Sequence, residues 1–314
     1  MASSVCVYLG KALANYNFGD DHPFGPHRHE AFYQGLKKTG LLSRLEICQP
    51  VSATETQIGW FHTSGYIHQV KERSATGEGY LDGGDTPAFR GVYEAAATVV
   101  GTSLAAMDNI LSGHCRRAFV PIAGLHHARR DRAAGFCVFN DCGVVIEALR
   151  RQHGVKRVAY IDIDAHHGDG VYYGFDNDPD LLLADLHEDG RYLYPGTGDA
   201  NETGVGVATG TKVNIPMAPG ANDDAFLTAW DRVEEYLQQG RPQFVILQCG
   251  ADSLAGDPIT HLKYSSRSHA YAAQRLCQLA DNYSDGRLLA LGGGGYNLAN
   301  ISMAWCAVVE AMLT

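Results

Sequence analysis

Acidic and imidazole side chains are concentrated in one short segment, Ile161 to Gly170. Asp162 and Asp164 lie two positions apart, and His166 follows two positions later. Residues two apart in a strand point to the same face, so both carboxylates would project together where the strand ends. Because buried, unpaired carboxylates are costly, the group requires mutual pairing or a cation. Carboxylate and imidazole ligands suit catalytic zinc, or Fe(II), Mn(II) or Co(II). The alternative is a polar loop with two capping aspartates.

A further carboxylate, Asp252, follows the apolar run Phe244 to Gly250. An Asp in this position is often a helix N-cap, and that alternative stays open when Asp252 is considered alone. Combined with Asp164 and His166, it supplies a third metal ligand and leaves room for a water molecule and a substrate carbonyl.

Two adjacent histidines, His126 and His127, form a second candidate group. As functional groups they would be general acid and base catalysts, and their second ring nitrogens would need orienting carboxylates. Asp162 and Asp169 fit that role. The alternative is a pair of core histidines whose hydrogen bonds are satisfied.

Four glycines precede Tyr296. Consecutive glycines permit close backbone approach and positive φ, and a tyrosine directly after them could donate its hydroxyl to an oxyanion. A flexible turn and a phosphate-binding loop are the alternatives, but neither G-x-G-x-x-G nor G-x-x-x-x-G-K-[ST] is present.

These candidates follow apolar, β-prone runs, which alternate with helical patterns. The predicted strands are Arg117 to Pro121, Val158 to Asp164, Phe244 to Gly250 and Arg287 to Leu291. The predicted helices are Gly91 to Leu111, Cys142 to His153, Ala221 to Gln239, Ser266 to Tyr283 and Leu298 to Leu313. This alternation predicts an α/β fold, a mostly parallel sheet with helices on both faces. Ligands bind at the carboxyl ends of such strands, where the candidate residues lie.

Composition narrows the class of protein. The 314 residues show no repeat or low-complexity tract, so one domain over residues 1–314 is expected. A net charge of −10 disfavours binding to nucleic acid or to anionic membranes. The chain shows no leader pattern and no long apolar run, and its eight cysteines include no C-x-x-C pair. A cytoplasmic protein without membrane spans is expected.

Taken together, the motifs resemble the arginase-like histone deacetylase superfamily. The similar segments are 124–141, 160–171, 194–198, 250–258 and 291–300, in matching order and spacing. Residues 16–24 and 85–89 are most similar to the bacterial acetoin-utilisation deacetylases.

The resemblance implies a role for each site residue. Asp164, His166 and Asp252 would bind Zn²⁺, with Fe²⁺ as the alternative metal in vivo. His127 would be the general base and then the acid, supported by Asp169, while His126 with Asp162 would help polarise the water. Tyr296 would donate to the oxyanion. The substrate tunnel would be formed by Gly135, Phe136 and Tyr194, with Leu125 near its end, Ile259 at its rim and Asp85 holding substrate backbone amides.

Potassium is also implied. One structural K⁺ site would use Asp162, Asp164, His166, Asp185 and Leu186. A second would use backbone carbonyls around Phe175, Asp178, Leu181 and Thr211.

Three positions depart from the family pattern. Asp185 stands where serine is usual, which would change the charge or affinity of the first potassium site. Tyr194 replaces a common phenylalanine. Ile259 stands where polyamine-selective relatives carry a glutamate.

The expected reaction is removal of an acetyl group from the side-chain amine of acetyl-lysine in a protein or peptide. The alternative substrate is an acetylated polyamine or another small acylated amine. A non-catalytic acyl-lysine-binding protein would have lost a ligand or the tyrosine, and an arginase-like dimanganese enzyme would need more carboxylates. The natural substrate and the acyl-chain length stay open, and a homo-oligomer is compatible with the sequence.

Overall fold

Apolar segments of the chain form a sheet in which every pair of neighbouring strands is parallel. The computed structural model describes residues 3–314 and places eight strands in the order β2-β1-β3-β8-β7-β4-β5-β6. The strands are β1 (Ser3–Tyr8), β2 (Glu46–Cys48), β3 (Cys115–Val120), β4 (Val158–Asp162), β5 (Leu181–Glu188), β6 (Lys212–Met217), β7 (Phe244–Gln248) and β8 (Leu288–Leu291). The predicted fold class is therefore confirmed.

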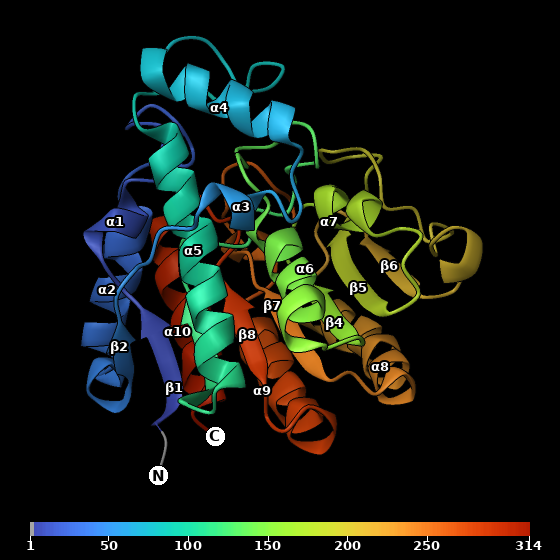
Figure 1. Cartoon of the computed structure of the whole chain (residues 1–314). Helices are drawn as coiled ribbons and strands as arrows, with labels where there is room; N and C mark the ends of the chain where they lie inside the picture. Colours follow the sequence, from blue (N-terminus) through green and yellow to red (C-terminus); the bar gives the residue numbers. More distant parts are fainter. Residues whose placement is uncertain (1–2) are drawn as a thin grey trace.

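Helices cover both faces of this sheet (Figure 1). The α-helices are α1 (Lys11–Ala14), α2 (Arg28–Lys38), α3 (Glu55–Ile58), α4 (Ser64–Thr76), α5 (Val92–Leu111), α6 (Asp141–His153), α7 (Asp169–Gly174), α8 (Asp223–Gly240), α9 (Ser266–Tyr283) and α10 (Leu298–Met312). Short 3₁₀ helices occupy Leu41–Arg44, Gly206–Ala208 and Ala251–Ser253. In Figure 1, α5 and α6 lie in front of the sheet, and α8, α9 and α10 lie behind it.

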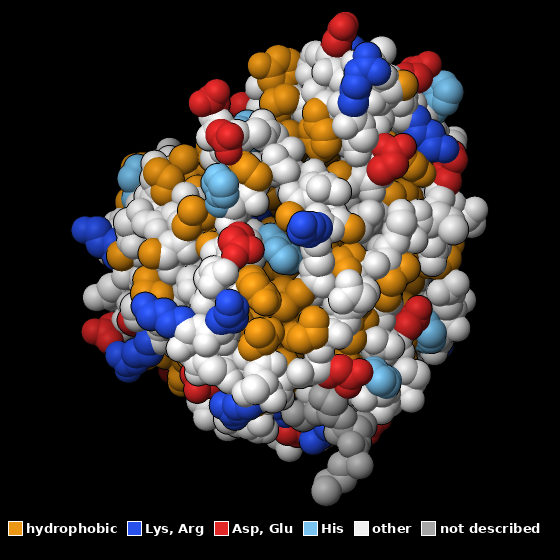
Figure 2. All heavy atoms as spheres, turned by 90° about the vertical axis from the view of Figure 1, so that its left-hand side faces the viewer, with side chains coloured by type: hydrophobic (Ala, Val, Ile, Leu, Met, Phe, Trp, Pro, Cys, Tyr) orange, Lys and Arg blue, Asp and Glu red, His pale blue; other side chains and the backbone are white. Residues whose placement is uncertain are grey.

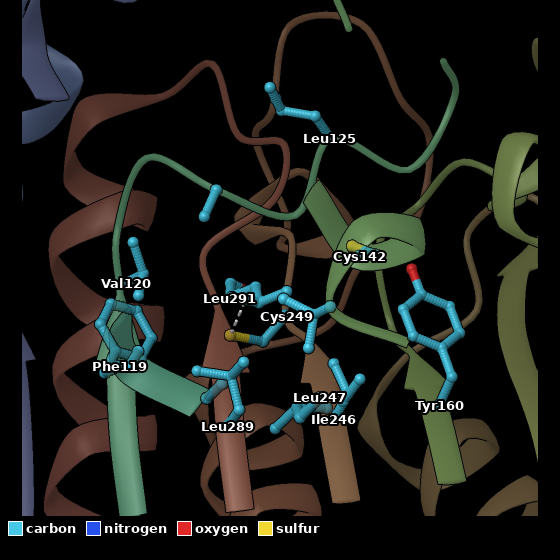
Figure 3. Close-up of a cluster of buried hydrophobic side chains, with 14 of the residues drawn as sticks. Phe119, Val120, Leu125, Cys142, Tyr160, Ile246, Leu247, Cys249, Leu289 and Leu291 are labelled. Atoms are coloured by element: carbon cyan, nitrogen blue, oxygen red, sulfur yellow. Dashed lines mark hydrogen bonds between the residues drawn. The ribbon is translucent and has the colours of Figure 1, made fainter. Parts of the chain in front are cut away.

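The central strands are buried, and this burial supplies the rigid base of the molecule. Every residue of β4, β5, β7 and β8 is buried. Figure 3 shows aliphatic and aromatic side chains from β3, β4, β7 and β8 packed together beneath the loops that leave the carboxyl ends of these strands. A near-continuous apolar run is typical of parallel strands covered on both faces, because neither face meets water.

The predicted strands and helices are all present, with small differences at their ends. The strand predicted over 158–164 ends at Asp162, because Asp164 N–H donates to the Asp162 side chain rather than to a neighbouring strand. The helix predicted from Ala221 begins at Asp223, because the Asn222 side chain accepts from Ala225 N–H and caps the helix.

On the face shown in Figure 2, Lys and Arg side chains lie singly or in small groups among acidic and apolar ones. Across residues 3–314, no helix combines the length and apolar character needed to cross a membrane.

Candidate active site

Three predicted metal ligands converge between the ends of β4 and β7. Ligand atoms of Asp164, His166 and Asp252 all lie within 4.8 Å of one another, and all three residues are buried. His166 Nδ1 lies 3.1 Å from Asp164 Oδ1 and 3.2 Å from Asp252 Oδ2. Strands β4 and β7 are hydrogen-bonded neighbours, so the loops that follow them meet at the same edge of the sheet.

The charge of this trio fits a divalent cation. Burial and the neighbouring Asp164 carboxylate raise the pKa of Asp252 to about 7. A low-dielectric site disfavours two adjacent carboxylates, and a cation between them removes the penalty. The donor set of two carboxylates and one imidazole is suited to zinc or Fe(II) in a site with open positions.

Neighbouring groups fix the orientation of the Asp164 carboxylate. Its Oδ2 accepts from Gln248 Nε2 at 2.8 Å and from Gly294 N–H at 2.8 Å. A Cβ on Gly294 would lie 2.1 Å from Asp252 Oδ2, so this position has space only for glycine. Hydrogen bonds of this kind hold a ligand in its coordinating orientation.

His126 lies beside these carboxylates and is tied to Asp162. Its Nδ1 is 2.8 Å from Asp162 Oδ2, and that carboxylate also accepts from Tyr160 Oη at 2.6 Å. Burial favours the neutral imidazole, but the charges of Asp162 and Asp164 outweigh it and raise the pKa of His126 to about 10. The carboxylates around His126 therefore favour its protonated form.

His127 has the opposite character. Its Nδ1 lies 2.7 Å from Asp169 Oδ1, and Arg129 donates to Asp169 Oδ2 at 2.7 Å. Burial and the neighbouring His126 charge lower the pKa of His127 to about 4, although Asp169 opposes the change. An Nδ1–H held by Asp169 leaves Nε2 as the free base. His127 Nε2 lies 3.1 Å from His126 Nε2, and both histidines line one small cavity.

The predicted oxyanion donor, Tyr296, closes another side of this space. Its backbone N–H donates to Asp257 Oδ2 at 2.8 Å, which fixes the end of the glycine segment. Burial and the charges of Asp252 and Asp164 raise the pKa of Tyr296 well above its ordinary value. The phenol therefore keeps the proton that a hydrogen-bond donor needs.

A cavity of about 20 Å³ lies among these groups. Its lining includes Leu125, His126, His127, Asp164, His166 and Tyr296. Such a space holds about one water-sized group.

Gly135 and Tyr194 lie beside His127, and Phe136 lies beside Tyr296; their role as tunnel walls stays a prediction. A Cβ on Gly135 would lie 2.5 Å from the His127 ring, so glycine allows the backbone to pass directly beside it. The Phe136 ring is 5.8 Å from that of Tyr296, and the Tyr194 ring is 5.1 Å from that of His127.

Comparisons with known proteins agree with this arrangement. The family model described as "Histone deacetylase domain" matches residues 22–312. The chain belongs to the histone deacetylase family. It is 38% identical to the acetoin utilization protein AcuC of Bacillus subtilis, over 98% of this chain and 81% of that protein. It is 32% identical to the histone deacetylase clr6 of Schizosaccharomyces pombe, over 96% of this chain and 75% of that protein. The crystal structure of the HDA15 HD domain superimposes with a TM-score of 0.90 at 29% identity, covering 99% of this chain and 90% of that one. The chain is thus a hydrolase of the deacetylase class.

In this deacetylase, Asp85, the residue predicted for the tunnel rim, lies in a hydrogen-bonded turn. The Asp82 carboxylate accepts from the backbone N–H groups of Asp85 and Thr86, both at 2.9 Å. The Asp85 carbonyl is 3.1 Å from His22 Nε2, and the His22 ring lies 4.6 Å from that of Phe136. Asp85 is exposed, and its carbonyl is linked through His22 to the Phe136 ring.

Ile259 is linked to the site through Asp257. One oxygen of Asp257 accepts from Ile259 N–H at 3.1 Å, and the other accepts from Tyr296 N–H. The backbone of Ile259 is therefore tied through Asp257 to the segment that holds Tyr296, and its place at the tunnel rim stays a prediction.

The first predicted potassium site stays a prediction, and its unusual residue has a clear partner. Asp185 is buried, accepts from Gly168 N–H at 2.8 Å and lies 2.7 Å from His187 Nδ1. Burial opposes protonation of His187, but the Asp185 charge raises its pKa. The extra carboxylate is therefore balanced by a histidine two residues later. Asp185 and Leu186 lie in β5, beside Asp162 in β4.

The second predicted potassium site does not fit the structure. Lys212 Nζ donates to the carbonyl oxygens of Asp178 at 2.8 Å and Leu181 at 2.9 Å. Two of the four oxygens assigned to a potassium ion therefore already contact an ammonium group. The physical reason is charge: a second cation among the same oxygens would be repelled by the first.

Two further site residues were not predicted from the sequence. Gln248 orients Asp164 through a hydrogen bond to its Oδ2. Arg28 is buried and donates to the carbonyls of Gly293 at 2.6 Å and Gly295 at 2.9 Å, which braces the glycine segment. The signal for Gln248 was a polar residue inside an otherwise apolar strand. Arg28 precedes its partners by more than 260 residues and has no comparable local signal.

Proposed function

We propose that this chain removes acetyl groups from the side-chain amine of acetyl-lysine in proteins or peptides, in a zinc-dependent reaction. The observation that carries the proposal is one small cavity lined by Asp164 and His166 of the metal trio, by His127 and by Tyr296. A metal trio, a neutral imidazole and a protonated phenol around one small space are the groups that amide hydrolysis requires.

Asp164, His166 and Asp252 would hold the metal. When bound there, zinc would supply Lewis-acid polarisation of the acetyl carbonyl and would lower the pKa of water. Fe²⁺ is compatible with the same donors. Metal analysis of the purified protein distinguishes the two.

The protein's own groups handle the protons. His127 Nε2 accepts a proton from the attacking water, while Asp169 holds the imidazole by its Nδ1–H. The same nitrogen then protonates the leaving lysine amine, and the amide C–N bond breaks to give acetate. The protonated His126 adds positive charge beside the reacting carbonyl, and Tyr296 donates its hydroxyl to the oxyanion.

Two features support a short acyl group on a peptide substrate. The inner cavity measures about 20 Å³, so even an acetyl group would need some movement of its walls, and longer acyl chains would need more. Asp85 is exposed at the rim, where its carboxylate can accept from substrate backbone N–H groups. Ile259 supplies no carboxylate for the distal amine of a polyamine.

The test compares kcat/KM for an acetyl-lysine peptide and an acetylated polyamine, in wild type and Asp85→Ala. Wild type should prefer the peptide, and the variant should lose about ten- to a hundredfold on the peptide alone, since charge-assisted hydrogen bonds contribute roughly 1.5–3 kcal/mol. Asp199→Ala, a change at another exposed acidic residue, is the control. Equal losses on both substrates, or a wild-type preference for the polyamine, would support the alternative substrate class.

A further inference from the structure

A lysine ammonium lies among backbone oxygens between α7 and β5. Lys212 opens β6 and is 1% exposed. Its Nζ donates to Asp178 O at 2.8 Å, to Leu181 O at 2.9 Å and to Thr211 Oγ1 at 2.9 Å. These three acceptors match the three N–H bonds of an ammonium group. A buried charge requires such contacts, because an unpaired one is strongly disfavoured.

The other oxygens around this position also have protein donors. Phe175 O accepts from Asp178 N–H at 3.1 Å, and Thr211 O accepts from Tyr236 Oη at 2.6 Å. The Asp178 carboxylate is paired with Arg150. Each of the four backbone carbonyls that the family resemblance assigned to a second potassium ion therefore accepts a hydrogen bond from a protein donor.

We propose that this chain has replaced a bound potassium ion at this position with the ammonium group of its own Lys212. The two cations carry the same charge, and rings of carbonyl oxygens bind potassium by replacing its hydration shell. An ammonium group takes over the same oxygens through hydrogen bonds. Because the lysine is part of β6, the link is intramolecular and does not depend on the potassium concentration.

The link fixes a segment that matters to the site. Helix α7 begins at Asp169, the partner of His127, and β5 carries Asp185. The connection between them, residues 175–180, is held to β6 by Lys212. Burial lowers the pKa of Lys212 to about 8, with the Asp178 charge opposing, so the ammonium form predominates at pH 7.

The experiment measures thermal unfolding of the full-length, metal-loaded protein in KCl and in tetramethylammonium chloride at equal ionic strength. In Lys212→Ala, which removes the ammonium and opens space, we expect a lower Tm that K⁺ restores by on the order of 5 °C more than in wild type. Lys212→Met keeps most of the side-chain volume and should be destabilised without this potassium response. Lys156→Ala, at an exposed lysine, should behave like wild type.

Potassium counting keeps the test decisive if Lys212→Ala does not fold. After dialysis against KCl, wild type should retain at most one K⁺ per chain, since only the first predicted site is available. Two K⁺ per chain in wild type would overturn the proposal. So would a potassium response of Tm that is the same in Lys212→Ala and wild type.

Discussion

At the scale of single residues, the different partners of the two adjacent histidines separate their roles. His127 is held by Asp169 and has a pKa lowered to about 4, which makes it a neutral base at pH 7. His126 is held by Asp162 and has a pKa raised to about 10. One imidazole is therefore available to move protons, and the other supplies charge.

We accordingly expect His127→Ala to reduce kcat on an acetyl-lysine peptide more than His126→Ala does. Loss of a general acid and base typically lowers the rate by about 10²–10⁴-fold. Steady-state kinetics on matched metal-loaded preparations measure the difference, with His68→Ala, an exposed histidine on α4, as the control. A larger loss in His126→Ala would reverse the two assignments.

Sequence reasoning reached most of these residues because each follows a strand that it identified. Asp162 ends β4, Asp164 and His166 follow it, and Asp252 follows β7. Spacing alone does not pair each carboxylate with its histidine, since the partners are 36 and 42 residues apart, but the family resemblance implied both pairs that the structure shows. The resemblance also implied a potassium ion where Lys212 lies, because its oxygens are backbone atoms and carry no sequence signature.

At the scale of elements, four strands were missed for physical reasons. β1 and β2 lie toward one edge of the sheet, and β2 has only three residues. β6 contains a lysine, an asparagine and Pro216, a composition unlike that of a central strand. Proline is tolerated there because β6 is an edge strand with unpaired N–H groups on one side. β5 carries three buried polar residues, Asp185, His187 and Glu188, which hide its apolar run in the sequence.

The turn at residues 82–86 supports Phe136, a predicted tunnel wall, through hydrogen bonds. Phe136 has a φ of 67°, an unusual conformation for a residue with a side chain. Its N–H donates to Thr86 Oγ1 at 3.1 Å, and its carbonyl accepts from Tyr16 Oη at 2.7 Å. Thr86 Oγ1 in turn donates to Asp82 Oδ2 at 2.5 Å. The wall is thus fixed by contacts from two distant segments.

Replacing Thr86 by valine keeps the shape of the side chain and removes this link. We expect KM for a peptide substrate to rise about fivefold with a smaller change in kcat, because one hydrogen bond contributes roughly 1 kcal/mol. Thr228→Val, at an exposed position of α8, is the matched control. A loss confined to kcat, with KM unchanged, would place Thr86 in the chemistry rather than in the wall.

At the scale of the whole molecule, buried neutral histidines make stability depend on pH. His62 is buried, and its Nε2 accepts from Asn140 N–H at 2.9 Å, a bond that protonation would remove. Burial lowers the pKa of His62 to about 3. Its contribution to stability is present above the unfolded pKa of about 6.5 and is lost as pH falls toward 3.

Between those limits, each such histidine contributes a slope of about 1.4 kcal/mol per pH unit. We expect the free energy of unfolding of His62→Gln to fall less steeply than that of wild type between pH 6.5 and 4.5. Denaturant titrations at several pH values give both slopes, and His68→Gln provides the exposed control. Parallel slopes for wild type and His62→Gln would show that His62 titrates normally.

The central claim is that Asp164, His166 and Asp252 hold the metal on which deacetylation depends. Zinc content per chain and release of acetate from an acetyl-lysine peptide, measured on the same samples of wild type and Asp252→Ala, test it most directly. We predict about one catalytic metal per wild-type chain. The variant should lose that metal, and its rate should fall at least about 10²-fold, as expected when a group required for catalysis is removed. An Asp252→Ala protein that keeps both its metal and its full activity would contradict the account.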